Sequence, residues 1–479
     1  PAAPERAPAL APHAARIVDG ALDGSEPAGV RQYLELMAEG GWRAPDLLLP
    51  GLLSLGQRDA GLRGPIAVVL GERGRWLAGL HPNGRWVGRT QLAGWPTAST
   101  LERRTLLQEL RQRDPAAAIA LLRGPADGPT FAAFDTASAA ERLAFCEALR
   151  VGLGPWDVDL LDHALDDRRA DIRQAVVEIA LLLPGSGLQA RAEARTEGMI
   201  TRRRGRLSGR HQIEIVLPAT CSDEMRRDGI SDTVSASSNL STAMAGEVMF
   251  EAELARVDPS VWTRRTGLTP EEFLGAEAHL PGATRPVNRL ITSGLLPAVL
   301  RHGDPGWAAA VLPRVGRVDQ GRLIACLAEP ARTQALTQTL SALRLDSYHP
   351  EGSAAQDRDG RWRDTPVQRI TTLLTAVPGP WSEPFSRAVW TALTALSARG
   401  YSDDYLLRGL LGPMAWALHP DTDLGDPDPD RPRYVDLDGR TRLSTILGAR
   451  RRLRAALANP PPADTGPAGP VSLPQEGPS

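Results

Sequence analysis

Two stretches far apart in the chain share one pattern, in which a leucine-rich helix stops at Asp-Pro and an alanine-rich helix follows. They read LLQELRQRDPAAAIALL (106–122) and LLPAVLRHGDPGWAAAVL (295–312), with Asp114 and Asp304 before the proline. Proline disfavours helical backbone in the residue before it and suits the first turn of a helix, so each Asp-Pro separates two helices. Helical pairs that recur along a chain are typical of an α-solenoid, and a looser third copy lies at 148–161. The sequence therefore predicts an all-α solenoid.

The segment DDRRADIRQAVVEIALLLPGSGLQARAEAR (166–195) allows two interpretations. The hexamer that begins at Gly185 fits the G-x-G-x-x-A fingerprint of dinucleotide-binding folds, which needs a strand before it and a second apolar strand after it. Residues 188–206 are almost wholly polar and offer no such strand. A helical pair explains more of the sequence, because four apolar residues step along one helical face before Pro184 and Gly185 end the helix. The residues of this expected repeat face are Ile172, Val176, Ile179 and Leu183.

Residue usage argues against several kinds of chemistry. All 55 basic residues are arginine, so the chain lacks the lysine of a Walker-type phosphate loop and of Schiff-base enzymes. The cysteines form no C-x-x-C motif, the histidines form no H-E-x-x-H motif, and no G-x-S-x-G elbow occurs. Asp426, Asp428 and Asp430 imitate the start of a calcium loop, but prolines interleave them and the glycine and distal glutamate are missing. We therefore expect no catalytic residue, no cofactor and no metal ion.

Proline-rich and polar stretches interrupt the helical pattern and suggest domain boundaries. Both ends of the chain are rich in proline and alanine and lack a hydrophobic period. Between them, SDTVSASSNLSTAMAG is small and polar, and DTDLGDPDPDRPR is acidic and broken by prolines. The expected segments are a disordered N-terminus (1–12), a helical solenoid (13–420) with a small β or loop insertion at about 201–246, an acidic linker (421–434), a C-terminal helix (435–458) and a disordered tail (459–479).

The most suggestive local feature is the arginine-rich run TRRRGRLSGRH at 201–211. It precedes QIEIVLP (212–218), whose alternation suits a short strand, so we expect one small β insertion near 205–218. An arginine-bearing hairpin could hold a phosphate group or an acidic partner, although a solvated charged face explains the same residues. The candidate binding residues are Arg202, Arg203, Arg204, Arg206 and Arg210.

The stretch ALDDRRADIRQAVVEIALLLPGSGLQAR (164–191) resembles the HEAT-like repeat of a bacterial family of unknown function. Similarity continues in VVLGERGRWLAGLHPNGRW (68–86), VDPSVWTRRTGLTPEEFL (257–274) and WSEPFSRAVWTAL (381–393), and covers most of residues 30–420. Members of that family are typically encoded near MoxR-type AAA ATPases, von Willebrand factor A-domain proteins and SWIM zinc-finger proteins. The resemblance implies a HEAT-like α-solenoid and a partner from such a system, and it attaches no catalytic residues.

We expect a non-catalytic scaffold or adaptor that binds a protein partner, because a curved helical array presents a long surface. The resemblance implies a MoxR-type AAA ATPase or a von Willebrand factor A-domain protein as that partner. The alternative is a nucleic-acid-binding HEAT-like protein that uses the Arg202–Arg206 cluster, but a formal net charge of −2 gives it no broad positive field.

The sequence also gives expectations about cellular setting. Arginine in place of lysine, with abundant alanine, glycine and proline, is typical of a GC-rich bacterial genome. We find no signal peptide and no stretch apolar enough to span a membrane, so we expect a cytoplasmic protein without membrane contact.

Overall fold

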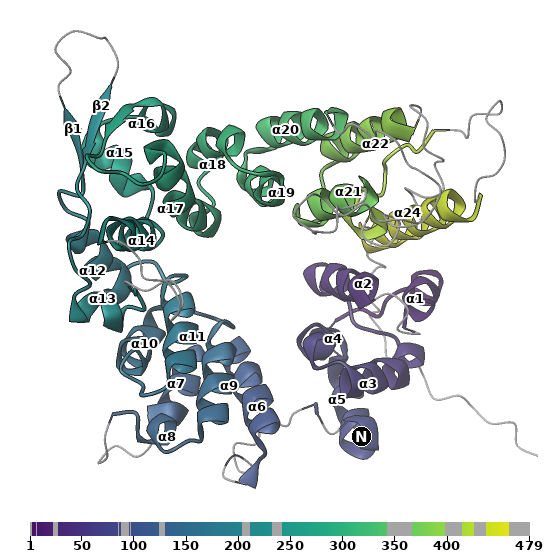
Figure 1. The fold of residues 1–479 in the computed structure, drawn as a ribbon. Coiled ribbons are helices and arrows are strands. Elements are labelled where there is room, and N and C mark those ends of the chain that lie inside the picture. Colours follow the sequence, from purple (N-terminus) through teal and green to yellow (C-terminus); the bar gives the residue numbers. More distant parts are fainter. Residues whose placement is uncertain are drawn as a thin grey trace, which may run out of the picture. The chain divides into compact units, whose positions relative to one another are not determined.

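The computed structural model describes residues 2–5, 7–22, 27–84, 86–87, 95, 97–123, 130–203, 211–231, 242–342, 366–397, 414–425 and 437–458. Most of these residues are helical, and a small sheet is formed by three short strands (Figure 1). The expected all-α fold class is therefore confirmed. No helix in this part of the chain is both long enough and apolar enough to cross a membrane.

The chain divides into two compact units, which we call unit 1 (residues 1–89 and 441–479) and unit 2 (residues 90–440). The helices of unit 1 are α1 (Pro12–Asp19), α2 (Pro27–Glu39), η1 (Asp46–Leu48), α3 (Leu49–Arg58), η2 (Ala60–Leu62), α4 (Arg63–Val69), α5 (Gly71–Leu80) and η3 (Pro82–Gly84). They are joined by α24 (Leu437–Ala458), most of which belongs to this unit. The single helical array expected over 13–420 is thus divided near residue 90.

Long-range contacts explain why unit 1 differs from the expected segments. The indole Nε1 of Trp42 donates to the carbonyl oxygen of Leu457 at 3.3 Å, which ties the end of α24 to the N-terminal helices. Near the other end of the chain, Leu10 is buried and its N–H donates to the carbonyl of Arg43 at 3.0 Å. Residues 7–11 therefore pack against the unit, although their composition suggested disorder. Such contacts between distant residues leave no local pattern in the sequence.

Unit 2 contains the remaining described helices. The first group is α6 (Thr100–Arg113), α7 (Pro115–Arg123), α8 (Ala132–Asp135), α9 (Ala139–Leu149), η5 (Pro155–Asp157), α10 (Val158–Ala164), α11 (Ala170–Ala180), α12 (Gly187–Arg195), α13 (Asp223–Arg227) and α14 (Thr242–Leu254). The second group is α15 (Ser260–Thr266), α16 (Pro270–Gly275), α17 (Val287–His302), α18 (Pro305–Val311), η6 (Leu312–Arg314), α19 (Arg317–Cys326), α20 (Glu329–Ser341), α21 (Pro366–Thr375) and α22 (Glu383–Ser397). Helices α6, α9 and α11 lie side by side (Figure 1).

The two Asp-Pro turns have the same geometry. The carboxylate of Asp114 accepts a hydrogen bond from the N–H of Ala117 at 2.9 Å, and that of Asp304 accepts from the N–H of Trp307 at 2.8 Å. Each aspartate thus caps the second helix of its pair, α7 or α18, and satisfies one N–H that has no partner within the helix. In the third copy, a short 3-10 helix, η5, follows Gly154 and leads directly into α10.

Helices α11 and α12 form the pair predicted from the segment 166–195, so this segment contains no strand–loop–helix unit. The hydroxyl of Ser186 accepts from the N–H of Gln189 and begins α12, while Gly185 adopts a φ of 75°, which favours glycine. The four residues of the expected repeat face belong to the apolar core of α6–α12, and all four are buried: Ile172, Val176, Ile179 and Leu183.

The sheet contains more than the expected insertion. Strand β1 (Ile200–Arg203) pairs antiparallel with β2 (Gln212–Ile215), and β2 pairs parallel with β3 (Glu277–His279). Of these strands, β2 lies inside the range expected at 205–218, whereas β1 lies wholly before it. Strand β3 is only three residues long and mostly polar, so the sequence gave no signal for it.

Candidate functional site

Arginines and carboxylates from four helices of unit 2 meet in one network, which we call the charged junction. The helices are α10, α12, α13 and α14, and every ion pair of the network joins different helices or the segments that follow them. The members of the charged junction are Asp162, Asp166, Arg191, Arg195, Glu224, Arg227, Asp228 and Glu253.

The inner part of the charged junction is buried. The side chains of Asp228 and Glu253 are 0% exposed, and Arg195 reaches both of them from α12. Its Nε donates to Glu253 at 2.6 Å and its NH1 donates to Asp228 at 2.8 Å. Arg191 lies one helical turn earlier, on the same face of α12, and its NH2 donates to Asp228 at 2.7 Å. Asp228 therefore holds two arginines of one helix.

The outer part of the charged junction ties α13 to α10 and to the turn after it. Arg227 donates to both carboxylate oxygens of Asp166, at 2.7 and 2.9 Å, and to the backbone carbonyl of Asp162 at 2.9 Å. Arg191 completes the connection with a hydrogen bond from its NH1 to the Asp162 carboxylate at 3.0 Å. The spacing of Asp162 and Asp166 matches that of Arg191 and Arg195, so each pair presents two charges from one face.

The protonation of the junction groups follows from their surroundings. Hydrogen bonds from Arg227 hold the pKa of Asp166 below its usual range. Burial raises the pKa of Glu253, and the hydrogen bonds from Arg195 only partly offset that effect. Burial also lowers the pKa of nearby Arg256 to about 10, so this guanidinium is still charged at neutral pH.

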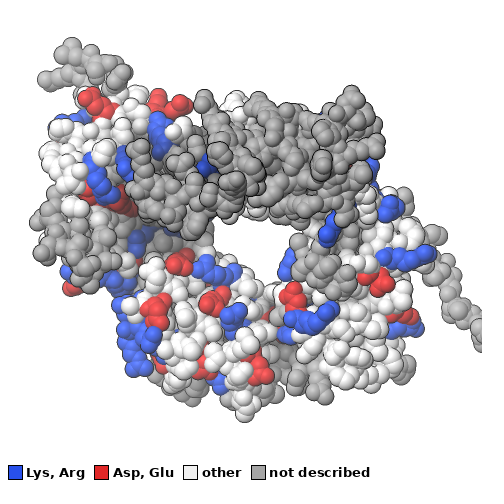
Figure 2. Space-filling view, turned by 45° about the vertical axis from the view of Figure 1, so that its right-hand side comes forward, with Lys and Arg blue, Asp and Glu red and all other residues white. Residues whose placement is uncertain are grey.

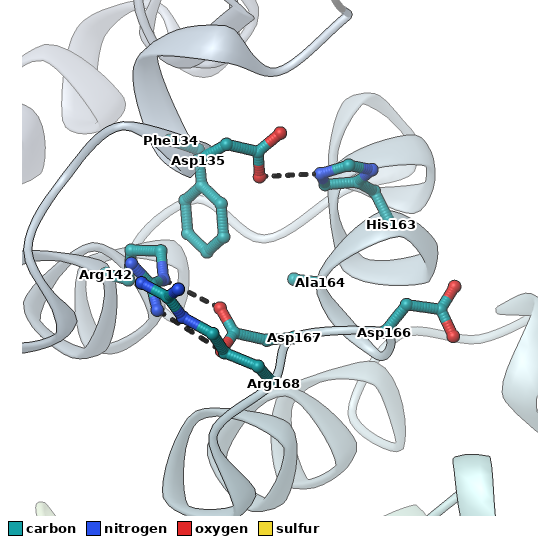
Figure 3. Close-up of a pocket in the computed structure, with 8 residues that line it drawn as sticks. All are labelled: Phe134, Asp135, Arg142, His163, Ala164, Asp166, Asp167 and Arg168. Atoms are coloured by element: carbon teal, nitrogen blue, oxygen red, sulfur yellow. Dashed lines mark hydrogen bonds and ion pairs between the residues drawn. The ribbon is translucent and has the colours of Figure 1, made fainter.

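A pocket of about 270 Å³ adjoins the charged junction and shares Asp166 with it. Figure 3 shows its lining, which comes from α8, α9, α10 and the turn before α11. The lining residues are Phe134, Asp135, Arg142, His163, Ala164, Asp166, Asp167 and Arg168.

Two ion pairs define opposite sides of the pocket (Figure 3). On one side, Arg142 donates from Nε to Asp167 at 2.7 Å, and these side chains are only 4% and 7% exposed. On the other side, His163 Nε2 lies 2.8 Å from a carboxylate oxygen of Asp135, and both of these side chains are partly exposed. The ring of Phe134 and the methyl group of Ala164 lie between the two pairs.

The lining residues can bind a ligand but offer little for covalent chemistry. Among them, no serine, threonine, cysteine, lysine or tyrosine occurs. The thiol of Cys146 on α9 is buried, and burial raises its pKa to about 12, so it is not a nucleophile at neutral pH. Within the described ranges, no cluster of histidine, cysteine, aspartate and glutamate could hold a metal ion.

The described members of the predicted arginine cluster, Arg202 and Arg203, lie on β1 and do not belong to the charged junction. Arg202 donates to the carbonyl of Thr266 at 3.3 Å and lies 3.2 Å from Nδ1 of His211. Arg203 forms an ion pair with Glu214 of β2 at 2.9 Å. The other three predicted residues, Arg204, Arg206 and Arg210, lie outside the described residues.

Sequence reasoning overlooked the charged junction because its partners are far apart in the chain. Arg195 and Glu253 are one such pair, and Arg227 and Asp162 are another. The available signal was the matching four-residue spacing of two acids on α10 and the turn after it and of two arginines on α12.

A family model, described as a family of unknown function (DUF5691), matches residues 1–457. Neither the curated proteins nor the solved structures contain a match to the chain.

Proposed function

The chain belongs to the DUF5691 family, whose function is unknown, and we propose that it is a non-catalytic scaffold that binds a protein partner. One observation carries this proposal. The ionisable groups of the charged junction, and those of the adjoining pocket other than Arg168, are held by ion-pair partners, and no serine, threonine, cysteine, lysine or tyrosine lines the pocket. Paired groups on packed helices make a rigid surface suited to recognition.

The arrangement of α6, α9 and α11 supports a HEAT-like solenoid as the framework of this scaffold. The three helices lie side by side, and successive helices are bridged by the ion pairs Arg104–Glu147, at 2.8 Å, and Arg150–Glu178, at 3.1 Å. Solenoids of this kind stack helical pairs and expose an extended surface, which commonly holds proteins.

Exposed apolar side chains on α5 supply a second line of support. Trp76 and Leu80 lie one turn apart on this helix and are 45% and 65% exposed. Contiguous exposed apolar side chains can mark interaction sites, and tryptophan is enriched among the residues that dominate binding energy. Arg73, one turn before Trp76, is paired with Asp46, so the apolar pair has a polar border.

The resemblance identified in the sequence suggests which partners to test first. They are a MoxR-type AAA ATPase and a von Willebrand factor A-domain protein, because members of the family that the sequence resembles are typically encoded near such proteins. We place the scaffold in a bacterial cytoplasm, where its three free cysteines would stay reduced.

Nucleic-acid binding through Arg202–Arg206 has less support. Arg203 is already paired with Glu214, and Arg202 contacts Thr266 and His211. Figure 2 shows that basic and acidic side chains of the described residues are interspersed on the visible face, whereas a nucleic-acid site is expected to gather positive charge.

The test is direct binding between the purified full chain and each purified candidate partner, followed by biolayer interferometry. Replacing both Trp76 and Leu80 with alanine should weaken binding about tenfold or more, because exposed tryptophans often carry interface energy. The matched control is Leu101→Ala, which removes a leucine that is 68% exposed in unit 2. If neither partner binds, or if binding disappears on nuclease treatment, the proposal is wrong.

A further inference from the structure

We infer that the pocket beside the charged junction binds a carboxylate group, and that the C-terminal carboxylate of a peptide fits it best. The biological occupant rests on the proposed function, since a scaffold would receive the peptide from its partner. Carboxylate binding itself does not depend on that proposal and can be measured separately.

Arg168 supplies an available positive charge at the pocket. Its side chain is exposed and extends toward the pair formed by Arg142 and Asp167 (Figure 3). Within the described part of the chain, it forms no hydrogen bond or ion pair, although its charge helps to lower the pKa of Asp167. A guanidinium presents N–H groups in a planar fork that matches a carboxylate.

Arg142 adds donors that water can hardly reach. A guanidinium has five N–H groups, and Arg142 uses Nε and NH2 toward Asp167 and NH1 toward the carbonyl of Ala137. With respect to the described residues, one N–H on each terminal nitrogen remains for another acceptor, while the side chain is only 4% exposed. A ligand oxygen in the pocket could satisfy these donors in a partly desolvated place, where hydrogen bonds to charged groups are strongest.

The carboxylates in the lining favour a singly charged ligand. Asp166 and Asp167 are neutralised by Arg227 and Arg142, but they still lie at the pocket together with Asp135. Repulsion from these groups grows with the charge of the ligand, so phosphate is disfavoured relative to a carboxylate.

The opposite side of the pocket suits the atoms that precede a peptide carboxylate. The pair of Asp135 and His163 offers an acceptor for an amide N–H, and Phe134 and Ala164 provide an apolar wall (Figure 3). A volume of about 270 Å³ is slightly below the range of pockets that hold drug-sized molecules, so a short peptide end fits better than a larger ligand.

Calorimetry on the full chain tests the inference with four probes. They are N-acetyl-Ala-Ala with a free carboxylate, the same dipeptide with a C-terminal amide, sodium acetate and inorganic phosphate, each up to about 10 mM because weak binding is expected for so small a contact. The free dipeptide should bind, and its amide should bind about tenfold or more weakly. The affinity for phosphate should not exceed the affinity for the free dipeptide. Acetate, which lacks an amide N–H, should bind more weakly than the dipeptide.

Adjacent arginines provide a matched pair of variants. Arg168→Gln should lower the affinity for the free dipeptide about tenfold or more, because the substitution removes the available guanidinium. Arg169→Gln is the control, because Arg169 is exposed, pairs with Asp171 and does not line the pocket. An unchanged thermal unfolding midpoint in both variants excludes loss of the fold.

Several results would overturn the inference. They are equal affinity for the dipeptide and its amide, tighter binding of phosphate, absence of any dipeptide binding, or equal effects of Arg168→Gln and Arg169→Gln. If acetate binds more tightly than the dipeptide, the pocket is a site for small carboxylates, and the inference that a peptide end occupies it is wrong. None of these results bears on partner binding through Trp76 and Leu80, so the failure of this inference and the failure of the proposed scaffold can be told apart.

Discussion

The arginines of helix α12 and those of strand β1 are close in sequence, yet the structure uses them differently. Arg195 on α12 is 12% exposed and holds two buried carboxylates, Asp228 and Glu253. Arg203 on β1 is 53% exposed and, within the part of the chain that the structure describes, pairs with Glu214 on the neighbouring strand. Local density of arginine therefore says little about which arginines hold the fold, because the carboxylates come from distant helices.

Spacing accounts for much of this difference. Residues four apart on a helix share a face, so Arg191 and Arg195 reach the same buried acid. Adjacent residues on a strand point to opposite faces, so Arg202 and Arg203 cannot converge on one partner. The comparison predicts that substitutions at the charged junction cost far more stability than substitutions on the β hairpin.

The largest loss of stability is expected where a charge is introduced into the apolar core of the packed helices. This loss is the reference against which the smaller effects below are compared. Ile179→Asp removes a side chain that is 1% exposed and leaves an unpaired carboxylate in its place. We expect a loss of more than about 4 kcal/mol, measured by urea unfolding. A melting temperature within a degree or so of the wild type would show that Ile179 does not face the core.

Asp228→Ala should have the next largest effect. It leaves Arg191 and Arg195 facing a space without their shared carboxylate, and breaking a buried pair in this way typically costs about 3 to 5 kcal/mol. Asp223→Ala is the matched control, since Asp223 is fully exposed and, among the described residues, its ion pair is with Arg226. Similar unfolding curves for Asp228→Ala and Asp223→Ala would remove the basis of the comparison.

Acid should weaken the charged junction. Asp166 has a folded-state pKa below its ordinary value because of Arg227, so the unfolded chain takes up the proton first as pH falls. The contribution of Asp166 is complete above the ordinary aspartate pKa, about 3.9, and is lost as pH falls through the lower folded-state value. Glu253 acts in the opposite sense, because its pKa is raised.

Urea unfolding between pH 3 and pH 7 checks this dependence, and Asp166→Asn should make it shallower at the acidic end. Asp166→Asn should lower the free energy of unfolding less than Asp228→Ala does, since the Asp166 side chain is 64% exposed and solvent screens its ion pair with Arg227. A pH dependence identical to that of the wild type would mean that Asp166 does not contribute through its charge.

The smallest effect is expected on the β hairpin. Arg203→Ala should change the free energy of unfolding by at most about 0.5 kcal/mol, because exposed ion pairs contribute little. Urea unfolding is again the measurement. A loss comparable to that of Asp228→Ala would show that the hairpin is as structurally important as the charged junction.

The sequence predicted features whose causes are local. Helical spacing and the Asp-Pro turns predicted the helical fold, and the lack of a second apolar strand after Gly187 excluded the dinucleotide-binding fold. The alternation in residues 212–215 predicted strand β2. Each of these patterns depends on neighbours within a few residues, which is the range over which capping, periodicity and turn preferences act.

Features that depend on distant contacts escaped prediction. Strand β3 is too short to show alternation, and the packing of α24 in unit 1 depends on contacts such as that of Trp42 with Leu457. The charged junction combines helices separated by many residues, so its carboxylates could not be matched to its arginines from the sequence alone. The pocket also could not be predicted from the sequence, because Arg142 and Asp167 meet only when α9 and the turn before α11 pack together.

The proposed scaffold is tested most directly by the salt dependence of binding with and without the arginines at positions 202, 203, 204 and 206. Duplex DNA held by four phosphate contacts should show a log–log slope of affinity against salt near −3.6, and replacing all four arginines with alanine should flatten it. A protein partner held by apolar side chains should depend only weakly on salt, and the four-alanine variant should bind it with nearly the same affinity. We predict this second behaviour for the purified partner and no tight DNA binding at about 150 mM salt. Tight DNA binding at that salt concentration, abolished in the four-alanine variant, would contradict the account.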